Sequence, residues 1–258
     1  MRLFLMLAAS AACLSAQLAA PNDAGISLGH VHLIVADPDA QKKVWIEALG
    51  ALEEKSGPLD LLKLPGIFII VSKGMPNGGS NGSSVNHIGL AVKDYAATKA
   101  KLAAANVMMQ ELTPNQQMFA MFPEDVRVEI MEVKDQAAPV AFHHMHLSVP
   151  DPEMTREWYV KTFGAMPGTR RGPAAMIPGG EVDFLKARMP QEPTKGRSLD
   201  HIGFEVKDLA AFLKKLEADG VKMDTPLRDM TQQIGLKIAF FTDPVGTRIE
   251  LTEGLIAK

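Results

Sequence analysis

Four histidines recur along the chain at one fixed spacing, and their side chains could bind a metal ion. Each is 57 residues from the next, and each begins a copy of the pattern His-x-x-Leu/Phe-x-Val-x-Asp. The copies begin at His30, His87, His144 and His201. A lone histidine on a strand is usually structural, but four at the same position in a repeat indicate a shared role. Imidazole nitrogen is a common ligand of transition metals.

Two glutamates could supply the carboxylates of such metal sites. Glu129 lies in RVEIME and Glu250 in TRIELTE, each between apolar neighbours. A carboxylate in the middle of an apolar strand is costly unless it is paired or binds a cation. An ion pair with Arg127 or Arg248 is the alternative explanation. These arginines share a strand face with the glutamates, so they could instead bind a carboxylate of the substrate.

In chain order, these ligands form two sets of two histidines and one glutamate. The sets are His30, His87 and Glu129, and His144, His201 and Glu250. A set of two histidines and one carboxylate suits divalent Fe, Mn, Ni, Co or Zn, and it leaves coordination positions open for substrate oxygens. We therefore expect a divalent metal ion as the cofactor, with its identity open.

Two more histidines stand two residues after a ligand candidate. They are His32 and His146, whereas the other two copies have glycine at this place. A histidine titrates near neutral pH, so His146 is a candidate general acid or base, and polar lining of the site is the alternative. The alternation of histidine and glycine suggests duplication of a module that was already doubled.

Each copy of the pattern predicts a strand that leads into a helix. In the first copy Val31, Leu33 and Val35 share one face and the histidines share the other. The closing aspartate suits a helix N-cap, because its carboxylate accepts from free backbone N–H groups. We expect helices over residues 38–49, 95–105, 152–163 and 209–219. Short apolar runs follow each helix, so the period predicts four βαβββ units.

The first twenty residues are typical of a secretory signal peptide. Arg2 precedes a short apolar stretch, and small residues follow before Pro21. We expect residues 1–20 to be removed and the mature protein to be periplasmic or secreted. Cys13, the only cysteine, lies in this segment, so thiol chemistry is excluded. No later apolar run is long enough to span a membrane, and a net charge of −3 does not favour nucleic acid as a partner.

The units are expected to form two modules along the chain. The first would span residues 26–134 and the second residues 142–254, with a linker at 135–141. The hydrophobic content of 47% is sufficient for a large buried core. A monomer and a homodimer are both compatible with this organisation.

The chain resembles the vicinal oxygen chelate superfamily, which includes glyoxalase I, fosfomycin and bleomycin resistance proteins and extradiol dioxygenases. The resemblance rests on the four repeated strands, on WYVKTFGA at 158–165 and on DPVGTRIELTE at 243–253. It implies an α+β fold in which paired βαβββ units form cupped mixed sheets around a divalent metal. The family's ligand positions fall on the six residues of the two sets. A fourth ligand would fall on Asp183 in the second set but on Ile69 or Ile70 in the first, which favours the second set.

Three functions are compatible with this resemblance. The first is a metal-dependent lyase or isomerase that acts on a small molecule with vicinal oxygens, with His146 or a carboxylate as the base. The second is an Fe(II) extradiol-type dioxygenase, which usually needs a tyrosine near the metal. Tyr95 and Tyr159 are the only tyrosines and both are predicted on helices, which argues against it. The third is a non-catalytic small-molecule binding protein of the bleomycin-resistance type.

Overall fold

The computed structural model describes residues 18–257. Residues 1–17, most of the expected signal peptide, lie outside the described residues. Within the described part, no helix is long and apolar enough to cross a membrane.

The described chain contains four consecutive βαβββ units, as the repeat predicts. Unit 1 comprises β1 (Ile26–Val35), α1 (Pro38–Lys43) with a π-helical continuation η1 (Val44–Ala48), β2 (Leu52–Ser56), β3 (Leu59–Leu64) and β4 (Ile67–Lys73). Unit 2 comprises β5 (Val85–Val92), α2 (Tyr95–Ala104), β6 (Met108–Thr113), β7 (Gln117–Phe122), the 3-10 turn η2 (Pro123–Asp125) and β8 (Val126–Glu132).

The second half repeats this order. Unit 3 comprises β9 (Val140–Val149), α3 (Pro152–Phe163), β10 (Met166–Thr169), β11 (Pro173–Ile177) and β12 (Gly180–Lys186). Unit 4 comprises β13 (Leu199–Val206), α4 (Leu209–Ala218), β14 (Met223–Met230), α5 (Thr231–Ile234), β15 (Leu236–Thr242) and β16 (Arg248–Glu253), followed by the 3-10 turn η3 (Leu255–Ala257). Strand β9 begins inside the expected linker.

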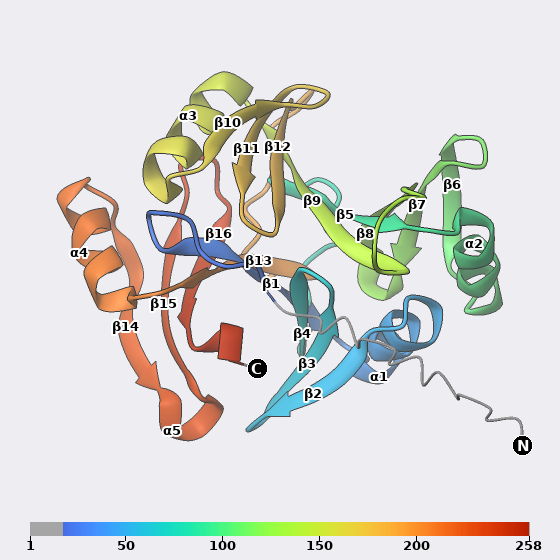
Figure 1. Ribbon diagram of the computed structural model, residues 1–258, viewed down its shortest axis with the longest axis horizontal. Helices are drawn as coiled ribbons and strands as arrows, with labels where there is room; N and C mark the ends of the chain where they lie inside the picture. The colour runs from blue at the N-terminus through green and yellow to red at the C-terminus, as the bar shows by residue number, and fades with distance from the viewer. Residues whose placement is uncertain (1–17, 258) are drawn as a thin grey trace, which may run out of the picture.

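The units combine into two eight-stranded mixed sheets, and each sheet joins one unit from each half of the chain (Figure 1). One sheet has the order β14-β15-β16-β13-β1-β4-β3-β2, so it contains units 1 and 4. The other has the order β10-β11-β12-β9-β5-β8-β7-β6, so it contains units 2 and 3. The expected modules at 26–134 and 142–254 therefore do not correspond to separate sheets.

The repeated strands lie at the centre of both sheets. Strand β1 pairs antiparallel with β13, and β5 pairs antiparallel with β9. The apolar face of each strand is buried under the helices, and in β1 this face consists of Val31, Leu33 and Val35. Because side chains alternate between the two faces of a strand, the histidines lie on the opposite, concave face.

The aspartate that closes each pattern caps the following helix, as predicted. The Asp94 carboxylate accepts from the backbone N–H of Ala97 at 2.8 Å, and Asp151 accepts from Met154 at 3.1 Å. Helix α3 ends where Gly164 adopts a left-handed conformation (φ 63°), as a C-terminal glycine allows. These caps explain why the pattern ends in aspartate, independently of any chemistry.

Candidate metal centres

Two clusters of four ligating side chains lie on the concave faces of the two sheets. The outer cluster, from units 1 and 4, consists of His30, His32, His201 and Glu250. The inner cluster, from units 2 and 3, consists of His87, Glu129, His144 and His146. In each cluster the four ligand atoms lie within 4.8 Å of one another. All six expected ligands, together with His32 and His146, are therefore in one cluster or the other.

The expected grouping of these ligands by chain halves is wrong. It placed His87 with His30, and His201 with His144. The register of the central strands instead sets His32 opposite His201 and His87 opposite His146. The reason is topological, because β1 pairs with β13 of the last unit and not with β5 of the next one.

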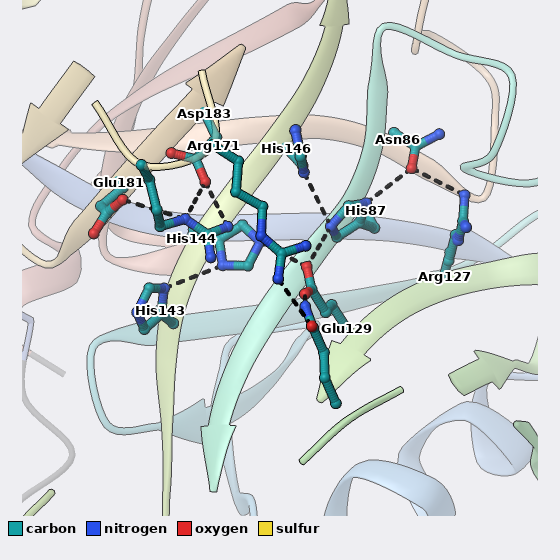
Figure 2. A network of polar contacts seen from close by, with 12 residues as sticks. Asn86, His87, Arg127, Glu129, His143, His144, His146, Arg171, Glu181 and Asp183 are labelled. Atoms are coloured by element: carbon teal, nitrogen blue, oxygen red, sulfur yellow. Dashed lines mark hydrogen bonds and ion pairs between the residues drawn. The ribbon is translucent and has the colours of Figure 1, made fainter. Parts of the chain in front are cut away.

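Glu129 is the centre of the inner cluster. Its Oε2 accepts from Nε2 of His87 at 2.9 Å and from Nε2 of His144 at 3.1 Å. Its Oε1 accepts from the side-chain amide of Gln117. Nδ1 of His146 lies 3.3 Å from Nε2 of His87, and Nε2 of His146 is buried without a hydrogen-bond partner. Figure 2 shows His87 and His146 pointing toward each other above the Glu129 carboxylate.

The inner cluster has the protonation states that metal ligands require. Burial lowers the pKa of His144 to about 4 and that of His146 to about 3, so both rings are neutral at pH 7. Burial alone would raise the pKa of Glu129, but its hydrogen bonds with His144 and His87 hold that pKa well below its usual range. Metal binding needs neutral imidazole and ionised carboxylate, and these are the states present.

A glycine makes room for one histidine ring in each cluster. A Cβ atom on Gly89 would lie 2.0 Å from the ring of His144, and a Cβ on Gly203 would lie 2.0 Å from the ring of His30. These glycines stand two residues after His87 and His201. The alternation of histidine and glycine in the repeat therefore reflects packing between paired units, because each pairing brings one copy of each kind together.

The outer cluster contains an additional carboxylate. Nε2 of His30 and Nε2 of His201 donate to Oε2 of Glu250 at 2.8 and 2.9 Å, and Nδ1 of His201 donates to Asp200 at 2.6 Å. Burial alone would lower the pKa of His201, but the hydrogen bonds to Asp200 and Glu250 outweigh it and raise the pKa. The two carboxylates thus favour the protonated form of His201. His32 bonds to Ser72, and burial lowers its pKa to about 3.

Apolar side chains fill the concave face beside the outer cluster. Phe68 and Ile70 of β4 stand opposite His30 and His32 in the parallel register. They belong to a buried apolar group formed by Leu18, Leu61, Phe68, Ile70, Leu236 and Leu255. Leu255 comes from η3 at the C-terminal end, which lies near β4 and β15 in Figure 1. Both ends of the described chain therefore contribute to this apolar filling.

The inner cluster instead lies beside an open cavity of about 420 Å³. His87, Glu129 and His146 line one part of it. The remaining lining is largely polar or charged and includes Gln117, Arg127, Ser148 and Arg171. A small molecule in this cavity would contact two of the histidines and the glutamate directly.

Asp183, the expected fourth ligand, lies outside the four-residue inner cluster. It is opposite His146 in the sheet, so its partners are unit 2 and unit 3 residues and not His201. Its Oδ2 accepts from Nε and Nη2 of Arg170 at 2.7 and 2.6 Å, and its Oδ1 is buried without a partner. The Asp183 carboxylate, which was expected to bind the metal, is bound by the Arg170 guanidinium. Ile70 occupies the equivalent place in the other sheet, as the sequence indicated.

The sequence did not single out several polar residues of the cavity. Gln117 lies in an apolar run, and Arg170 and Arg171 lie in the turn before β11, where the repeat gives no guidance. One signal was available. The residue before the leading histidine is Asn86 in unit 2 and Asp200 in unit 4, and both side chains bond to that histidine.

Part of the chain matches a protein family in sequence, and its fold is similar to that of solved structures. Residues 141–251 match the Glyoxalase/Bleomycin resistance protein/Dioxygenase superfamily. The structure is similar to glyoxalase I from Zea mays, with a TM-score of 0.71, 16% identity, and coverage of 90% of this chain and 94% of the other. It is also similar to a putative dioxygenase from Bacillus subtilis, with a TM-score of 0.69, 17% identity, and coverage of 92% and 86%. No curated protein matches in sequence.

These findings confirm the resemblance to the vicinal oxygen chelate superfamily and the α+β fold with paired modules and cupped sheets. The identity with the solved structures is low, so their likeness concerns the fold. The chemistry of this chain must be argued from its own two clusters.

Proposed function

We propose that this protein is a metal-dependent enzyme of the glyoxalase and dioxygenase type, with the inner cluster as its working site. Its substrate would be a small molecule with vicinal oxygens, and its reaction a lyase or isomerase reaction. The observation that carries this proposal is the convergence of three imidazoles and one carboxylate, within 4.8 Å of one another, beside a cavity of about 420 Å³.

The donor set of the inner cluster fits a divalent transition metal. Imidazole nitrogen together with carboxylate oxygen suits Zn, Fe, Mn, Co or Ni. His87, His144 and Glu129 would hold the ion, and the Gln117 amide would orient the glutamate, as second-layer partners of metal ligands do. A bound ion would supply Lewis acidity, polarising a substrate oxygen and stabilising negative charge as it develops.

His146 is our candidate for moving the proton. It lines the cavity, its ring is neutral at pH 7, and its Nε2 has no hydrogen-bond partner. A neutral ring nitrogen beside the substrate can accept a proton from a carbon next to a polarised carbonyl. Negative charge that develops on the substrate would raise the pKa of His146. The ring would therefore hold the proton more tightly at the stage of the reaction at which it is transferred.

The lyase or isomerase reaction is preferred over ring-cleaving oxygenation because both tyrosines have other partners. The Tyr95 hydroxyl donates to Glu111 at 3.0 Å, and the Tyr159 hydroxyl donates to Asp243 at 2.8 Å. Both residues belong to the core that packs helices against the sheets. Neither lines the cavity beside the inner cluster.

Export remains part of the proposal and is supported by the N-terminal sequence. The cleavage site decides whether the mature protein keeps Leu18, which is buried in the apolar group beside the outer cluster. Cleavage after Ala16 would keep this leucine, whereas cleavage after Ala20 would remove it. N-terminal sequencing of secreted material tests both points, and an intact Met1 would contradict export.

Cobalt substitution tests the proposed metal site. We expect Co²⁺ added to metal-free protein to give visible ligand-field bands at about one ion per chain, and His144→Ala to shift or abolish them. Oxygen uptake with an Fe²⁺-loaded protein and a catechol would favour the dioxygenase alternative. If no divalent ion binds stoichiometrically, the protein is better described as a metal-free binding protein.

A further inference from the structure

Arg127 and Arg248 occupy equivalent places beside the two clusters. Each lies two residues before the glutamate of its cluster, on strands β8 and β16. Each guanidinium also lies over an aromatic ring. Cζ of Arg127 is 3.6 Å from the ring centroid of Phe119, and Cζ of Arg248 is 4.4 Å from that of Phe240. The two rings are equivalent as well, because each pairs with the cluster glutamate in the neighbouring strand.

The two guanidinium groups bind different kinds of oxygen, a carboxylate in one case and side-chain amides in the other. Nη1 of Arg248 donates to the Asp200 carboxylate at 2.6 Å. Nη1 of Arg127 donates to the amide oxygens of Asn86 and Asn81 at 3.0 and 3.2 Å. Asn86 stands where unit 4 has Asp200. Arg127 therefore makes no ion pair with a carboxylate within residues 18–257, and Glu129, two residues away, is the carboxylate whose charge acts on it.

A second arginine lines the same cavity without an ion pair among the described residues. Nη2 of Arg171 donates to the side-chain oxygen of Gln117 at 2.9 Å. Its neighbour Arg170 differs, because it is bound to Asp183. Glu129, the carboxylate that lines the cavity, already accepts from His87, His144 and Gln117. The cavity thus has two cationic side chains and one carboxylate, so the positive side chains are in excess.

We propose that Arg127 and Arg171 form a carboxylate-binding subsite, and that the natural ligand is a small organic acid. A guanidinium presents parallel N–H donors that match a carboxylate, and stacking on Phe119 fixes the plane of the Arg127 donors. The carboxylate subsite does not depend on the proposed function. Only the further statement that the other oxygens of the acid face the inner cluster rests on it.

Succinate binding to metal-free protein tests the subsite separately from the metal site. Succinate is the charged probe, and succinamide is its neutral counterpart of similar shape. We expect calorimetry after chelator treatment to detect succinate binding to the wild type, with succinamide binding at least about tenfold weaker. A tenfold difference corresponds to about 1.4 kcal/mol.

Two variants and one control test the contribution of Arg127. Arg127→Gln removes the positive charge. Asn86→Asp keeps Arg127 and gives it the carboxylate partner that Arg248 has in the other cluster. Each is expected to weaken succinate binding about tenfold or more. Arg228→Gln, at an exposed arginine on β14, is the control and should bind as the wild type does. Circular dichroism shows which variants are folded.

Equal binding of succinate and succinamide, unchanged affinity in folded Arg127→Gln and Asn86→Asp proteins, or no succinate binding to the wild type would each overturn the subsite. Because no metal is present in these titrations, failure of metal binding leaves their outcome unaffected. Conversely, a protein that binds metal but not succinate retains the proposed metal site and loses only the carboxylate subsite.

Discussion

The two clusters carry the same kinds of ligand but have opposite surroundings. Ile70 and Ile238 beside the outer cluster stand where Asp183 and Gln117 stand beside the inner one. Apolar side chains fill the first face, while a cavity with charged lining opens at the second. The repeated strand thus provides the metal-ligating side chains, whereas positions outside the repeated pattern decide whether a small molecule could reach them.

The charges of the two clusters also differ. In the outer cluster the carboxylates of Glu250 and Asp200 contact His201 and raise its pKa. Arg248 also pairs with Asp200, so much of the negative charge is offset within the cluster. In the inner cluster Asn86 replaces the second carboxylate. Glu129 and neutral imidazoles remain, and these are the groups that bind a divalent cation. We therefore expect the outer cluster to act mainly as a buried structural network.

Leu255→Ala should have the largest effect on stability and should separate the two faces. Leu255 is fully buried in the apolar filling beside the outer cluster. Truncating a buried leucine typically costs about 2–5 kcal/mol. We expect a loss of this size in urea unfolding with unchanged Co²⁺ affinity. A loss of Co²⁺ binding in the folded variant would show that the outer cluster is the main metal site.

Gly89→Ala and Gly203→Ala form a matched pair with a smaller expected effect. Each added Cβ would collide with a histidine ring, and overpacking of this kind typically costs about 1–3 kcal/mol. Both variants should therefore lower the free energy of unfolding. Only Gly89→Ala should also weaken metal binding, because His144 would have to move. Equal metal affinities in the two folded variants would contradict this account.

The pKa values of His87 and His201 give a subtler test. Burial lowers the pKa of His87, whereas hydrogen bonds raise that of His201. At pH 6.5 in metal-free protein, we expect nitrogen-15 spectra to show His87 mostly neutral and His201 mostly protonated. The stability that His201 contributes below pH 6.5 is lost as the pH rises through its raised pKa. The lowered pKa of His87 instead costs stability as the pH falls below 6.5. Asn86→Asp should raise the pKa of His87.

Local structure could be predicted well from the sequence. Helix α3 (Pro152–Phe163) has the expected bounds, because Asp151 caps its start and Gly164 ends it. The expected helix over 38–49 is present but changes from α to π at Val44. The apolar alternation placed Val31, Leu33 and Val35 in the core, and so placed the histidines on the other face.

The pairing of units could not be predicted in the same way. A copy with His-x-His must face a copy with His-x-Gly, because the glycine accommodates the partner's ring. Pairing unit 1 with unit 2 satisfies this condition as well as pairing it with unit 4. The outcome depends on long-range contacts of β1 and β13. The Arg170–Asp183 pair was missed for a related reason, since Arg170 lies in a turn outside the repeat.

The most direct test of the central claim is metal affinity in a matched pair, Glu129→Gln and Glu250→Gln. Each variant removes the central carboxylate of one cluster and keeps its size. We expect about one tightly bound Zn²⁺ or Co²⁺ per wild-type chain, a loss of affinity on the order of 100-fold in Glu129→Gln, and wild-type affinity in folded Glu250→Gln. Retention of tight binding in Glu129→Gln with loss in Glu250→Gln would contradict the assignment of the inner cluster as the working site.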